Sequence, residues 1–434
     1  MGKFSFVDLF AGIGGFRLGL EKIGGVCIAS SEIESKAMET YRRNWPNDAD
    51  SHNLGDITYI KKIKKHDLLV GGVPCQPWSI AGKNRGFEDD RGQLWNDVIR
   101  LVSSSKPRAF IFENVKGLVD PRHIEYLKHI LNSFREAGYD VQYKLLNSHD
   151  YGVPQNRDRV FIVGTYKKYT KKIFEWPEYI QHHQKLHDIF EGIKPPQSKN
   201  NSSPIQRDMF GERTNMSFNK LTSKDQRNAF FILTDIRNGP TSIHSWDFKP
   251  TTKREKFICM TILKNRRRPQ YGPCDGNPMS FSDIKALIHD LDEDELIKLI
   301  KKEILRQYEE DKRYEFVNRR LSGGIGGVYR IYLPECTFFS TLTATGIKDV
   351  IATESVSGKS DSEYKSNFIT DILIPKNYRT ISALEALRLQ GFPKKFKLPE
   401  SESVSKRLLG NAVAVPIISF LGKSLEQTGV FKKN

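Results

Sequence analysis

A cysteine in a loop between two prolines is the residue of this sequence best suited to nucleophilic chemistry. Cys75 lies between Pro74 and Pro77, directly after an apolar run that ends at Gly71 and Gly72. Glycine and proline fix a loop without covering it with apolar side chains, so the thiol should be presented at the end of a strand. The alternative is that Cys75 is buried in the core like a small hydrophobic residue, as most free cysteines are. The loop therefore predicts a thiolate nucleophile.

A carboxylate stands at the equivalent place after the next apolar run. Glu113 closes the run 109–112, and the ends of neighbouring parallel strands meet at one edge of a sheet. We therefore expect Glu113 and Cys75 to lie together. A thiolate beside a carboxylic acid suits covalent addition to an electron-poor ring, because the acid can hold or protonate a ring nitrogen. Taken alone, Glu113 could equally cap the following turn.

Two arginines stand near the start of a later strand. Arg157 and Arg159 follow Gln155, and side chains two residues apart project to one side of an extended chain. Such a pair could bind a phosphate or a base carbonyl next to the thiol. An exposed strand start with solvated side chains is the alternative.

A glycine-rich turn near the start of the sequence indicates a nucleotide site. Residues 4–10 are strand-like, Gly12, Gly14 and Gly15 form the turn, and residues 16–22 are helix-like. Strand, glycine turn and helix form the entry to nucleotide-binding folds. The third glycine of the dinucleotide fingerprint is missing, which argues against a nicotinamide or flavin cofactor. A tight connection without a ligand is the alternative.

Two acidic residues further along suit a nucleoside. Glu32 follows the second strand-like run, where an acidic side chain can accept hydrogen bonds from both ribose hydroxyls. Asp56 could accept a hydrogen bond from an adenine amino group. It could instead cap a helical segment at 57–63.

The elements that would position these residues alternate between strand and helix. This alternation implies an α/β fold with a mostly parallel, doubly wound sheet, whose ligands bind at the carboxyl ends of the strands. Every polar signal described above falls at such an end. The expected strands are 4–10, 26–30, 68–72, 109–112, 141–146 and 159–163, and the expected helices include 16–22, 94–102, 124–134, 381–390 and 413–425.

Two domains are expected from a chain of 434 residues, because single cores rarely grow to that size. The alternation is lost from about residue 176 to 368. We predict a catalytic and cofactor-binding domain at 1–175, completed by 395–434. A second, smaller domain with a hinge is predicted at 176–394.

Within the second domain, helical apolar stripes are followed by a strand-like stretch. Asp292 and Glu295 have the spacing of a capping box at the start of one of these helices. The order is compatible with a winged-helix-like element at about 280–320, although two helices and a hairpin are not specific to that motif.

Composition limits the class of protein. Hydrophobic residues make up 38% and charged residues 28% of the chain, as in globular proteins, and no apolar run approaches the length of about 18 residues that spans a membrane. The five cysteines are widely spaced, which argues against a disulfide framework or a zinc ribbon. We expect a cytoplasmic protein. Its net charge of +16 suits a partner that carries phosphates.

Taken in order, these segments resemble the motifs of the DNA (cytosine-5)-methyltransferases. The resemblance covers roughly residues 4–166 and 376–425, and six or more motifs in the family's order are highly specific. The matching segments are 6–16, Glu32, Asp56, Pro74-Cys75-Gln76, Glu113-Asn114-Val115, Gln155-x-Arg157-x-Arg159, 379–393 and Gly410-Asn411-Ala412-Val413.

The resemblance implies a Rossmann-like domain that transfers a methyl group from S-adenosylmethionine to carbon 5 of cytosine, leaving S-adenosylhomocysteine and using no metal. Cys75 would attack carbon 6 and Glu113 would stabilise the ring at N3. Arg157 and Arg159 would complete the catalytic set by orienting the base and a neighbouring phosphate. The implied cofactor site consists of Phe10, Gly12, Ile13, Gly14, Gly15, Glu32, Ile33, Asp56, Ile57, Val73, Pro74, Asn411 and Val413.

The same resemblance implies that the target base leaves the duplex, since carbons 5 and 6 are hidden in the base stack. The second domain would be a target-recognition domain. Between Lys249 and Arg268 stand eight Lys/Arg residues and one acid, and some of these would contact DNA, although a solvated basic loop is the alternative for any one of them. The implied DNA-contacting residues are Gln76, Ser79, Lys83, Arg85, Gln155, Arg266, Arg267, Arg268 and Thr341.

The expected partner is double-stranded DNA, and we expect no membrane partner. The protein is expected to act as a monomer and to be associated with the bacterial nucleoid through the DNA that it binds. A restriction endonuclease acting on the same site would accompany a role in restriction and modification. An RNA cytosine-5 methyltransferase is the alternative with the same thiol chemistry. Pro74-Cys75-Gln76 and Glu113 oppose a third reading, a catalytically silent DNA-binding regulator.

Overall fold

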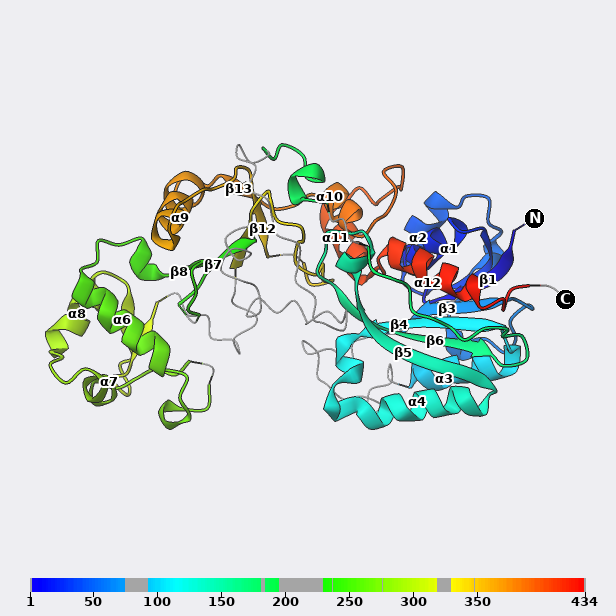
Figure 1. The fold of residues 1–434 in the computed structure, drawn as a ribbon, viewed down its shortest axis with the longest axis horizontal. Coiled ribbons are helices and arrows are strands. Elements are labelled where there is room, and N and C mark those ends of the chain that lie inside the picture. The colour runs from blue at the N-terminus through cyan, green and yellow to red at the C-terminus, as the bar shows by residue number, and fades with distance from the viewer. Residues whose placement is uncertain are drawn as a thin grey trace. The chain divides into compact units, whose positions relative to one another are not determined.

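The computed structural model describes residues 2–74, 93–180, 184–194, 229–235, 237–274, 276–317, 329–346 and 348–432. The chain divides into two compact units, coloured along the chain in Figure 1. The first unit comprises Met1–Ile189, Thr337–Ile347 and Ser382–Asn434, and the second comprises Phe190–Cys336 and Lys348–Ile381.

A six-stranded sheet forms the centre of the first unit. Its strand order is β2-β1-β3-β4-β6-β5; the first four strands are parallel, and β6 is antiparallel to both of its neighbours. The order reverses at β1, because the chain places β2 on one side of it and β3 on the other. Open α/β sheets bind ligands at such a point. The strands are β1 Phe4–Leu9, β2 Gly25–Ser31, β3 Leu68–Gly72, β4 Ala109–Val115, β5 Tyr139–Asn147 and β6 Asp158–Tyr166.

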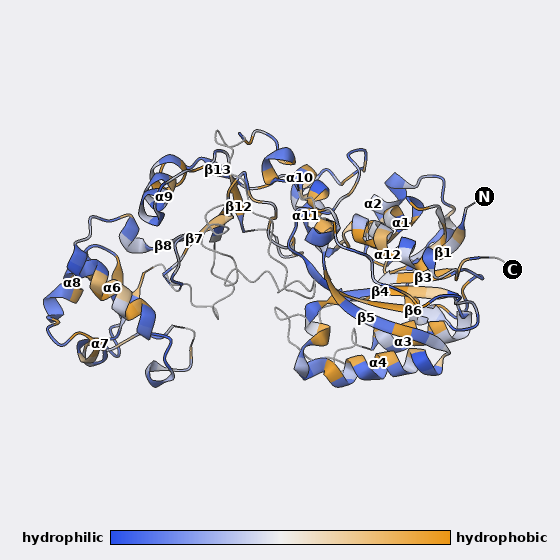
Figure 2. Ribbon diagram, viewed as in Figure 1, coloured by the Kyte–Doolittle hydropathy of each residue, from blue (hydrophilic) through white to orange (hydrophobic). Residues whose placement is uncertain are grey.

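Helices cover both faces of this sheet, with α1 and α12 on one side and α3 and α4 on the other (Figure 1). Phe6 belongs to the core under α1 and α12, whereas its neighbour Val7 belongs to the core under α3 and α4. Figure 2 shows hydrophobic residues along β3 and β4 between the two layers. The predicted doubly wound α/β class is therefore confirmed. The helices are α1 Gly15–Glu21, α2 Ser35–Asn44, α3 Leu94–Ser105, α4 Ile124–Glu136, α10 Ala383–Leu389, α11 Glu402–Asn411 and α12 Val415–Gln427.

Close helix packing returns the end of the chain to its beginning. The hydroxyl of Ser419 in α12 donates a 2.8 Å hydrogen bond to the carbonyl of Gly19 in α1. A Cβ at Gly19 would stand 2.7 Å from Cβ of Ile418, so only glycine permits this approach. The stretch Glu402–Gln427 is long and apolar enough to cross a membrane by composition, yet 78% of its most apolar window is buried in this unit.

The bounds of the first unit differ from the predicted domain bounds, because three connecting segments are hydrogen-bonded to other parts of this unit. Tyr151 donates a hydrogen bond of 3.2 Å to the carbonyl of Pro177, which ties residues 176–189 to this unit. The backbone amide of Phe339 donates to the carbonyl of Pro154 at 2.8 Å. Gln390 donates to the carbonyl of Leu409 at 2.7 Å. Such pairings join positions far apart in sequence, which local patterns do not reveal.

The second unit contains a five-stranded sheet of its own, in the order β13-β12-β11-β7-β8. Helix α9, Asp361–Asn367, and a π-helical turn, Phe368–Leu373, accompany it. Phe231 in β7 stacks on Phe368 at a centroid distance of 3.7 Å, in a core that also holds Ile331 and Tyr364. The strands are β7 Phe230–Leu233, β8 Ser242–Ile243, β11 Tyr329–Tyr332, β12 Val350–Ala352 and β13 Tyr378–Arg379.

Three helices and a hairpin form a separate core within the second unit. Met279, between the first and second of these helices, pairs antiparallel with Tyr314 of the hairpin and so adds a third, minimal strand. Helix, strand, two helices and two strands is the order of a winged helix. The predicted capping box of Asp292 and Glu295 is confirmed at the start of the third helix. The elements are α6 Lys253–Asn265, α7 Phe281–Leu287, α8 Glu293–Lys301, β9 Leu305–Gln307 and β10 Tyr314–Phe316.

Replacing Gly19 by alanine should destabilise the first unit. The new Cβ would meet Ile418 at 2.7 Å and the carbonyl oxygen of Val415 at 2.9 Å, so α12 must move. We expect Gly19→Ala to lower the free energy of unfolding by about 1–3 kcal/mol, measured by urea titration. The control is Gly239→Ala, whose Cβ would meet its nearest neighbour, Ser242 Oγ, at 3.6 Å. Equal stability of the two variants would contradict the packing argument.

Candidate active site

A pocket of about 430 Å³ opens at the carboxyl ends of the parallel strands in the first unit. Every residue predicted for the cofactor lines this pocket except Gly14. The reversal of strand order at β1 therefore coincides with the predicted binding site. Sequence reasoning missed further lining residues, most of which lie beside the motifs: Phe16, Glu34, Ala37, Thr58, Leu94 and Leu408.

The glycine turn after β1 forms one wall. Gly12 has a φ of +56° and a Cβ there would meet only the carbonyl of Phe10, at 4.0 Å. A ligand can therefore approach the backbone at Gly12 closely. Gly15 is different, because a Cβ there would stand 2.8 Å from Cγ1 of Val413. This contact sets the C-terminal segment against the turn and closes the pocket.

Gly14 serves the turn from behind and does not line the pocket. Its φ is +89°, and a Cβ there would stand 2.4 Å from the indole of Trp45. The expectation that Gly14 contacts the cofactor is corrected accordingly. The glycine is needed for its left-handed backbone and for the close approach of Trp45.

Glu32 organises the second wall. Its Oε2 accepts a hydrogen bond of 2.8 Å from the amide of Gly12. Its Oε1 accepts from the amides of Ile33 and Glu34, both at 2.8 Å. The carboxylate thus fastens the end of β2 to the glycine turn while it faces the pocket. A carboxylate has about four acceptor positions, so the hydrogen bond to Gly12 leaves room on Oε2 for a ligand hydroxyl.

Asp56 combines the two readings that its sequence position allowed. Its Oδ1 accepts from the amide and the hydroxyl of Thr58, both at 2.9 Å, and so caps a short 3-10 turn, Ile57–Tyr59. From the described part of the chain, Oδ2 receives no hydrogen bond. Since Asp56 and Thr58 both line the pocket, the cap also holds a free acceptor there.

An ion pair stands at the end of β4. Arg159 Nε lies 2.8 Å from Glu113 Oε1, and the two side chains are 16% and 12% exposed. This shortest contact of the pair uses Oε1, and Glu113 lines the pocket, where Oε2 could accept or donate a hydrogen bond to a ligand. The predicted neighbours Glu113 and Arg159 are thus brought together.

The segment that precedes Cys75 lies beside this ion pair. Gly72 of β3 pairs with Glu113 of β4, and the amide of Val73 donates to the carbonyl of Glu113 at 3.1 Å. Pro74 lines the pocket. Cys75 follows it directly. Five predicted site residues lie outside the described residues: Cys75, Gln76, Ser79, Lys83 and Arg85.

Arg157 is bonded to backbone carbonyls from distant parts of the first unit. Its side chain, 2% exposed, donates to the carbonyls of Leu342, Gly410 and Ala412 at 2.8, 3.1 and 2.9 Å. Arg157 also lines the pocket, so its predicted catalytic role stays a prediction beside the structural role that these hydrogen bonds give it. It holds the segment that carries Asn411 against the pocket.

Two further predictions of DNA contact are contradicted by burial. Gln155 is fully buried and donates to the carbonyl of Leu389 at 2.9 Å. In the second unit, Arg266 is 1% exposed and pairs at 3.1 Å with Glu315, which is itself buried. Neither side chain can reach a phosphate, because each is bonded inside its unit.

Other predicted DNA contacts remain predictions. Arg267 and Arg268 are exposed. Thr341 is half-buried and its hydroxyl donates at 2.5 Å to the carbonyl of Asn156, which engages its proton within the first unit.

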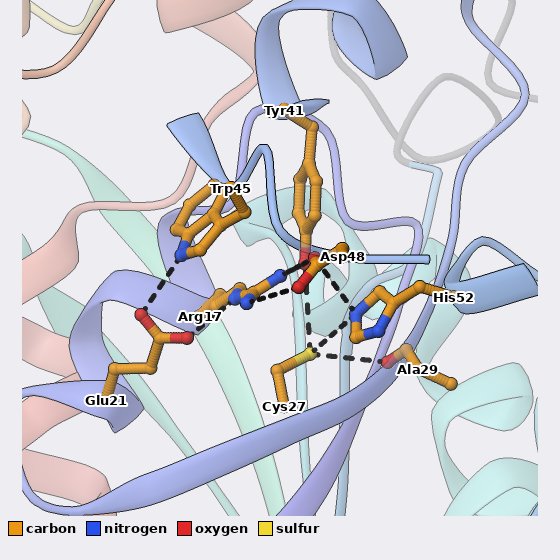
Figure 3. A network of polar contacts seen from close by, with 8 residues as sticks. All are labelled: Arg17, Glu21, Cys27, Ala29, Tyr41, Trp45, Asp48 and His52. Carbon is orange, nitrogen blue, oxygen red and sulfur yellow. Dashed lines mark hydrogen bonds and ion pairs between the residues drawn. The ribbon is translucent and has the colours of Figure 1, made fainter. Parts of the chain in front are cut away.

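A buried polar network supports the glycine turn from behind (Figure 3). Arg17 in α1 donates to Glu21 at 2.6 Å and to the hydroxyl of Tyr41 at 3.0 Å, and it forms an ion pair with Asp48. Its guanidinium lies 4.4 Å from the ring centre of Trp45. Burial lowers the pKa of Arg17, but the hydrogen bonds that it donates to Asp48 and Glu21 raise this pKa above its usual value. The network therefore holds a permanent cation and keeps Trp45 against the turn.

Cys27 belongs to the same network and is not a second nucleophile. Its sulfur lies 3.8 Å from the hydroxyl of Tyr41 and 3.5 Å from Nε2 of His52, as Figure 3 shows. Burial raises the pKa of Cys27 to about 12. A thiol with that pKa stays protonated and unreactive near neutral pH.

The fold and the pocket define an α/β protein whose pocket, at the carboxyl ends of the parallel strands, is lined by a glycine turn and by a carboxylate and arginine pair. The sequence profile of the C-5 cytosine-specific DNA methylase family matches residues 4–427. The chain belongs to this family, and it is a DNA (cytosine-5)-methyltransferase.

Relatives match over the full length. The chain is 60% identical to the Type II methylase M.HgiEI of Herpetosiphon aurantiacus over 433 residues, which is 100% of this chain and 99% of the relative. It is 32% identical to the Type II methyltransferase M.BanI of Aneurinibacillus aneurinilyticus, covering 99% of this chain and 97% of the relative. DNMT2 of Spodoptera frugiperda has the same fold, with a TM-score of 0.53 at 16% identity, over 97% of this chain and 99% of DNMT2.

Asp8 should make the stability of the first unit depend on pH. Its side chain is fully buried in β1, and burial raises the pKa of its carboxyl well above the usual value, an effect that Arg17 partly offsets. The folded state therefore keeps the proton, whereas the unfolded state releases it above a pH of about 4. The stability that the carboxyl contributes is complete below that pH and is lost as the pH rises toward the folded pKa.

Asp8→Asn removes this proton at nearly constant size. Between pH 5.5 and 8.5, we expect the unfolding free energy of the wild type to fall relative to that of the variant, by up to about 1.4 kcal/mol per pH unit. Urea unfolding at several pH values measures both slopes. Curves that stay parallel across the range, whatever the constant offset caused by the amide itself, would refute the buried proton.

Proposed function

We propose that this protein transfers a methyl group from S-adenosylmethionine to carbon 5 of a cytosine within a specific sequence of duplex DNA. The observation that carries the proposal is the ion pair between Glu113 in β4 and Arg159 in β6. Glu113 pairs with Gly72 of β3, which stands three residues before Cys75. The pair lines the same pocket as the glycine turn. A methyl donor and a pyrimidine ring would thus meet in one place.

The described residues fit the cofactor. Gly12 leaves its side of the pocket open, Glu32 offers acceptor positions for ribose hydroxyls, and Asp56 keeps Oδ2 free for an adenine amino group. Asn411 and Val413 close the pocket from the C-terminal side. When bound, S-adenosylmethionine supplies an electrophilic methyl group on a sulfonium and leaves as S-adenosylhomocysteine.

The chain's own residues would prepare the cytosine. The thiolate of Cys75 adds to carbon 6, which makes carbon 5 nucleophilic. Glu113 holds the ring at N3 through Oε2, and Arg159 fixes the Glu113 carboxyl from its other oxygen. After methyl transfer, a base removes the proton from carbon 5, and the electron pair expels the thiolate. Every bond made to the enzyme is thereby broken again.

The target base must leave the duplex to reach this pocket, at a cost of about a few kcal/mol. We assign the second unit to target recognition, because it has its own cores and lies outside the sheet that forms the pocket. The protein would act as a monomer in restriction and modification, protecting DNA from an endonuclease that cuts the same sequence.

Cytosine replaced by 5-fluorocytosine in duplex DNA should trap the protein covalently. Fluorine on carbon 5 cannot be lost as a proton is, so the thiolate of Cys75 stays bonded to carbon 6. With S-adenosylmethionine and a pool of duplex sequences, we expect an adduct that survives denaturing electrophoresis and maps to Cys75 by mass spectrometry.

The matched variants are Cys75→Ser and Cys274→Ser, the second at an exposed cysteine. Cys75→Ser should form no adduct and still bind DNA, whereas Cys274→Ser should react as the wild type does. Absence of any adduct across the sequence pool, or a trapped Cys75→Ser protein, would overturn the nucleophile. An adduct with RNA alone would favour the RNA methyltransferase. Bisulfite sequencing of DNA from an expressing host then locates the target.

A further inference from the structure

The first helix of the winged-helix element, α6, has a basic exposed face. Lys253, Lys256 and Lys264 are exposed, and Arg267 and Arg268 continue the row beyond the helix end. The opposite face of α6 carries Ile258, Cys259, Ile262 and Leu263, all buried in the core of the element. Lys256 stands three positions after Lys253, and Lys264 stands eight after Lys256, which is close to two helical turns, so the three lysines lie on one side of the helix.

The lysines on this face have no ion-pair role inside the described part of the protein. Among the described residues, Lys253, Lys256, Lys264 and Arg268 have no ion-pair partner, whereas Arg254 on the inner side pairs with Glu295 at 2.9 Å. The single acid of α6, Glu255, is buried and paired with Lys302 at 2.7 Å. The exposed face therefore presents positive charge without a neutralising acid of its own helix.

Helix α8 has the opposite character. In the helix-turn-helix order, the later helix of the motif usually enters the major groove with its N-terminal residues at the base edges. In α8 those residues are Glu293, Asp294 and Glu295, preceded by exposed Asp292. Carboxylates in a row would be repelled by the phosphates that line a groove. Its position in the motif would make α8 the helix that reads DNA, but its negative charge opposes that role.

The turn between β9 and β10 extends the acidic side. Glu309, Glu310 and Asp311 are exposed there, at the place where a winged helix often adds a second contact with DNA. The acids are thus concentrated at the N-terminal end of α8 and in the first part of the hairpin turn, where Asp311 pairs with Arg313 at 3.3 Å. The lysines without a described ion-pair partner lie on the outer face of α6. Only one orientation toward a polyanion is electrostatically favourable.

We propose that the outer face of α6, continued by Arg267 and Arg268, binds the phosphate backbone of the DNA duplex, and that α8 faces away from the DNA. This assignment rests on the proposed function of the second unit. From Lys253 to Lys264 the helix rises about 16 Å, and a duplex carries a charge about every 1.7 Å of its axis. An extended row of cations suits this extended polyanion better than a single small anion.

Phe257 gives the same face an apolar contact. Its side chain is 51% exposed and stands one turn after Lys253. An exposed aromatic ring among lysines can pack on deoxyribose or on a thymine methyl group. The lysines therefore set the affinity, and Phe257 is the candidate on this face for a contact with sugar or base.

Paired charge reversals test the orientation. Lys256→Glu with Lys264→Glu changes the outer face of α6, and Lys298→Glu with Lys301→Glu changes exposed lysines of α8 by the same charge. Affinity for a random-sequence duplex of 30 base pairs is measured by fluorescence anisotropy at several salt concentrations. Binding of labelled S-adenosylmethionine to each variant checks that the first unit is intact, and circular dichroism checks the whole chain.

We expect the α6 pair to bind DNA at least about tenfold more weakly and to reduce the slope of log affinity against log salt by about 1.8, since each lost phosphate contact removes about 0.9. The α8 pair should stay within about twofold of the wild type, because no phosphate contact is lost. Equal losses in both pairs, or a larger loss in the α8 pair, would overturn the proposal.

Methyl transfer to unmethylated plasmid DNA separates this proposal from the one on which it rests. A wild type that transfers no methyl group would refute the proposed function. A wild type that transfers methyl groups, while the α6 pair binds DNA with unchanged affinity and salt slope, would refute only the assignment of α6.

Discussion

The guanidinium of Arg157 is the interaction on which the pocket depends. It joins three carbonyls, of Leu342, Gly410 and Ala412, that come from segments about 180 to 250 residues further along the chain. Each carbonyl left without its donor would cost about 1–3 kcal/mol. Without this cation, the wall that carries Asn411 would lose two hydrogen bonds to the residue that precedes β6. The packing of α12 on Gly19 of α1 brings the same wall close from the other side.

Three arginines near the site thus do three different kinds of work. Arg157 holds distant segments together, Arg159 faces the pocket through Glu113, and Arg17 keeps Trp45 against the glycine turn. All three guanidiniums remain charged at any physiological pH. Their roles differ because the surroundings of each guanidinium differ. Arg157 and Arg17 are nearly excluded from water.

The net charge of +16 overstates the positive surface. Arg17, Arg157 and Arg266 are buried and bonded within their units, so they contribute nothing to the capture of a polyanion. The lysines on the outer face of α6 are the opposite case, because they are exposed and have no acid of their own. The number of basic residues therefore sets only an upper limit on the electrostatic attraction for DNA. Which basic side chains are buried determines where on the surface that attraction acts.

The sequence by itself determined the alternation of strands and helices, the strand ends that carry Glu113 and Glu32, and the glycine turn, because these depend on local periodicity and on motif order. The family followed from the same motifs. Local sequence patterns could not predict that Gly14 contacts Trp45, that Gln155 is hydrogen-bonded to Leu389 or that Arg266 pairs with Glu315. Only the tertiary structure decided these contacts. A polar side chain beside a motif is hydrogen-bonded inside the protein when a distant part of the chain packs next to it, and otherwise it is available to a ligand. The same long-range contacts, and not composition, set the bounds of the two units.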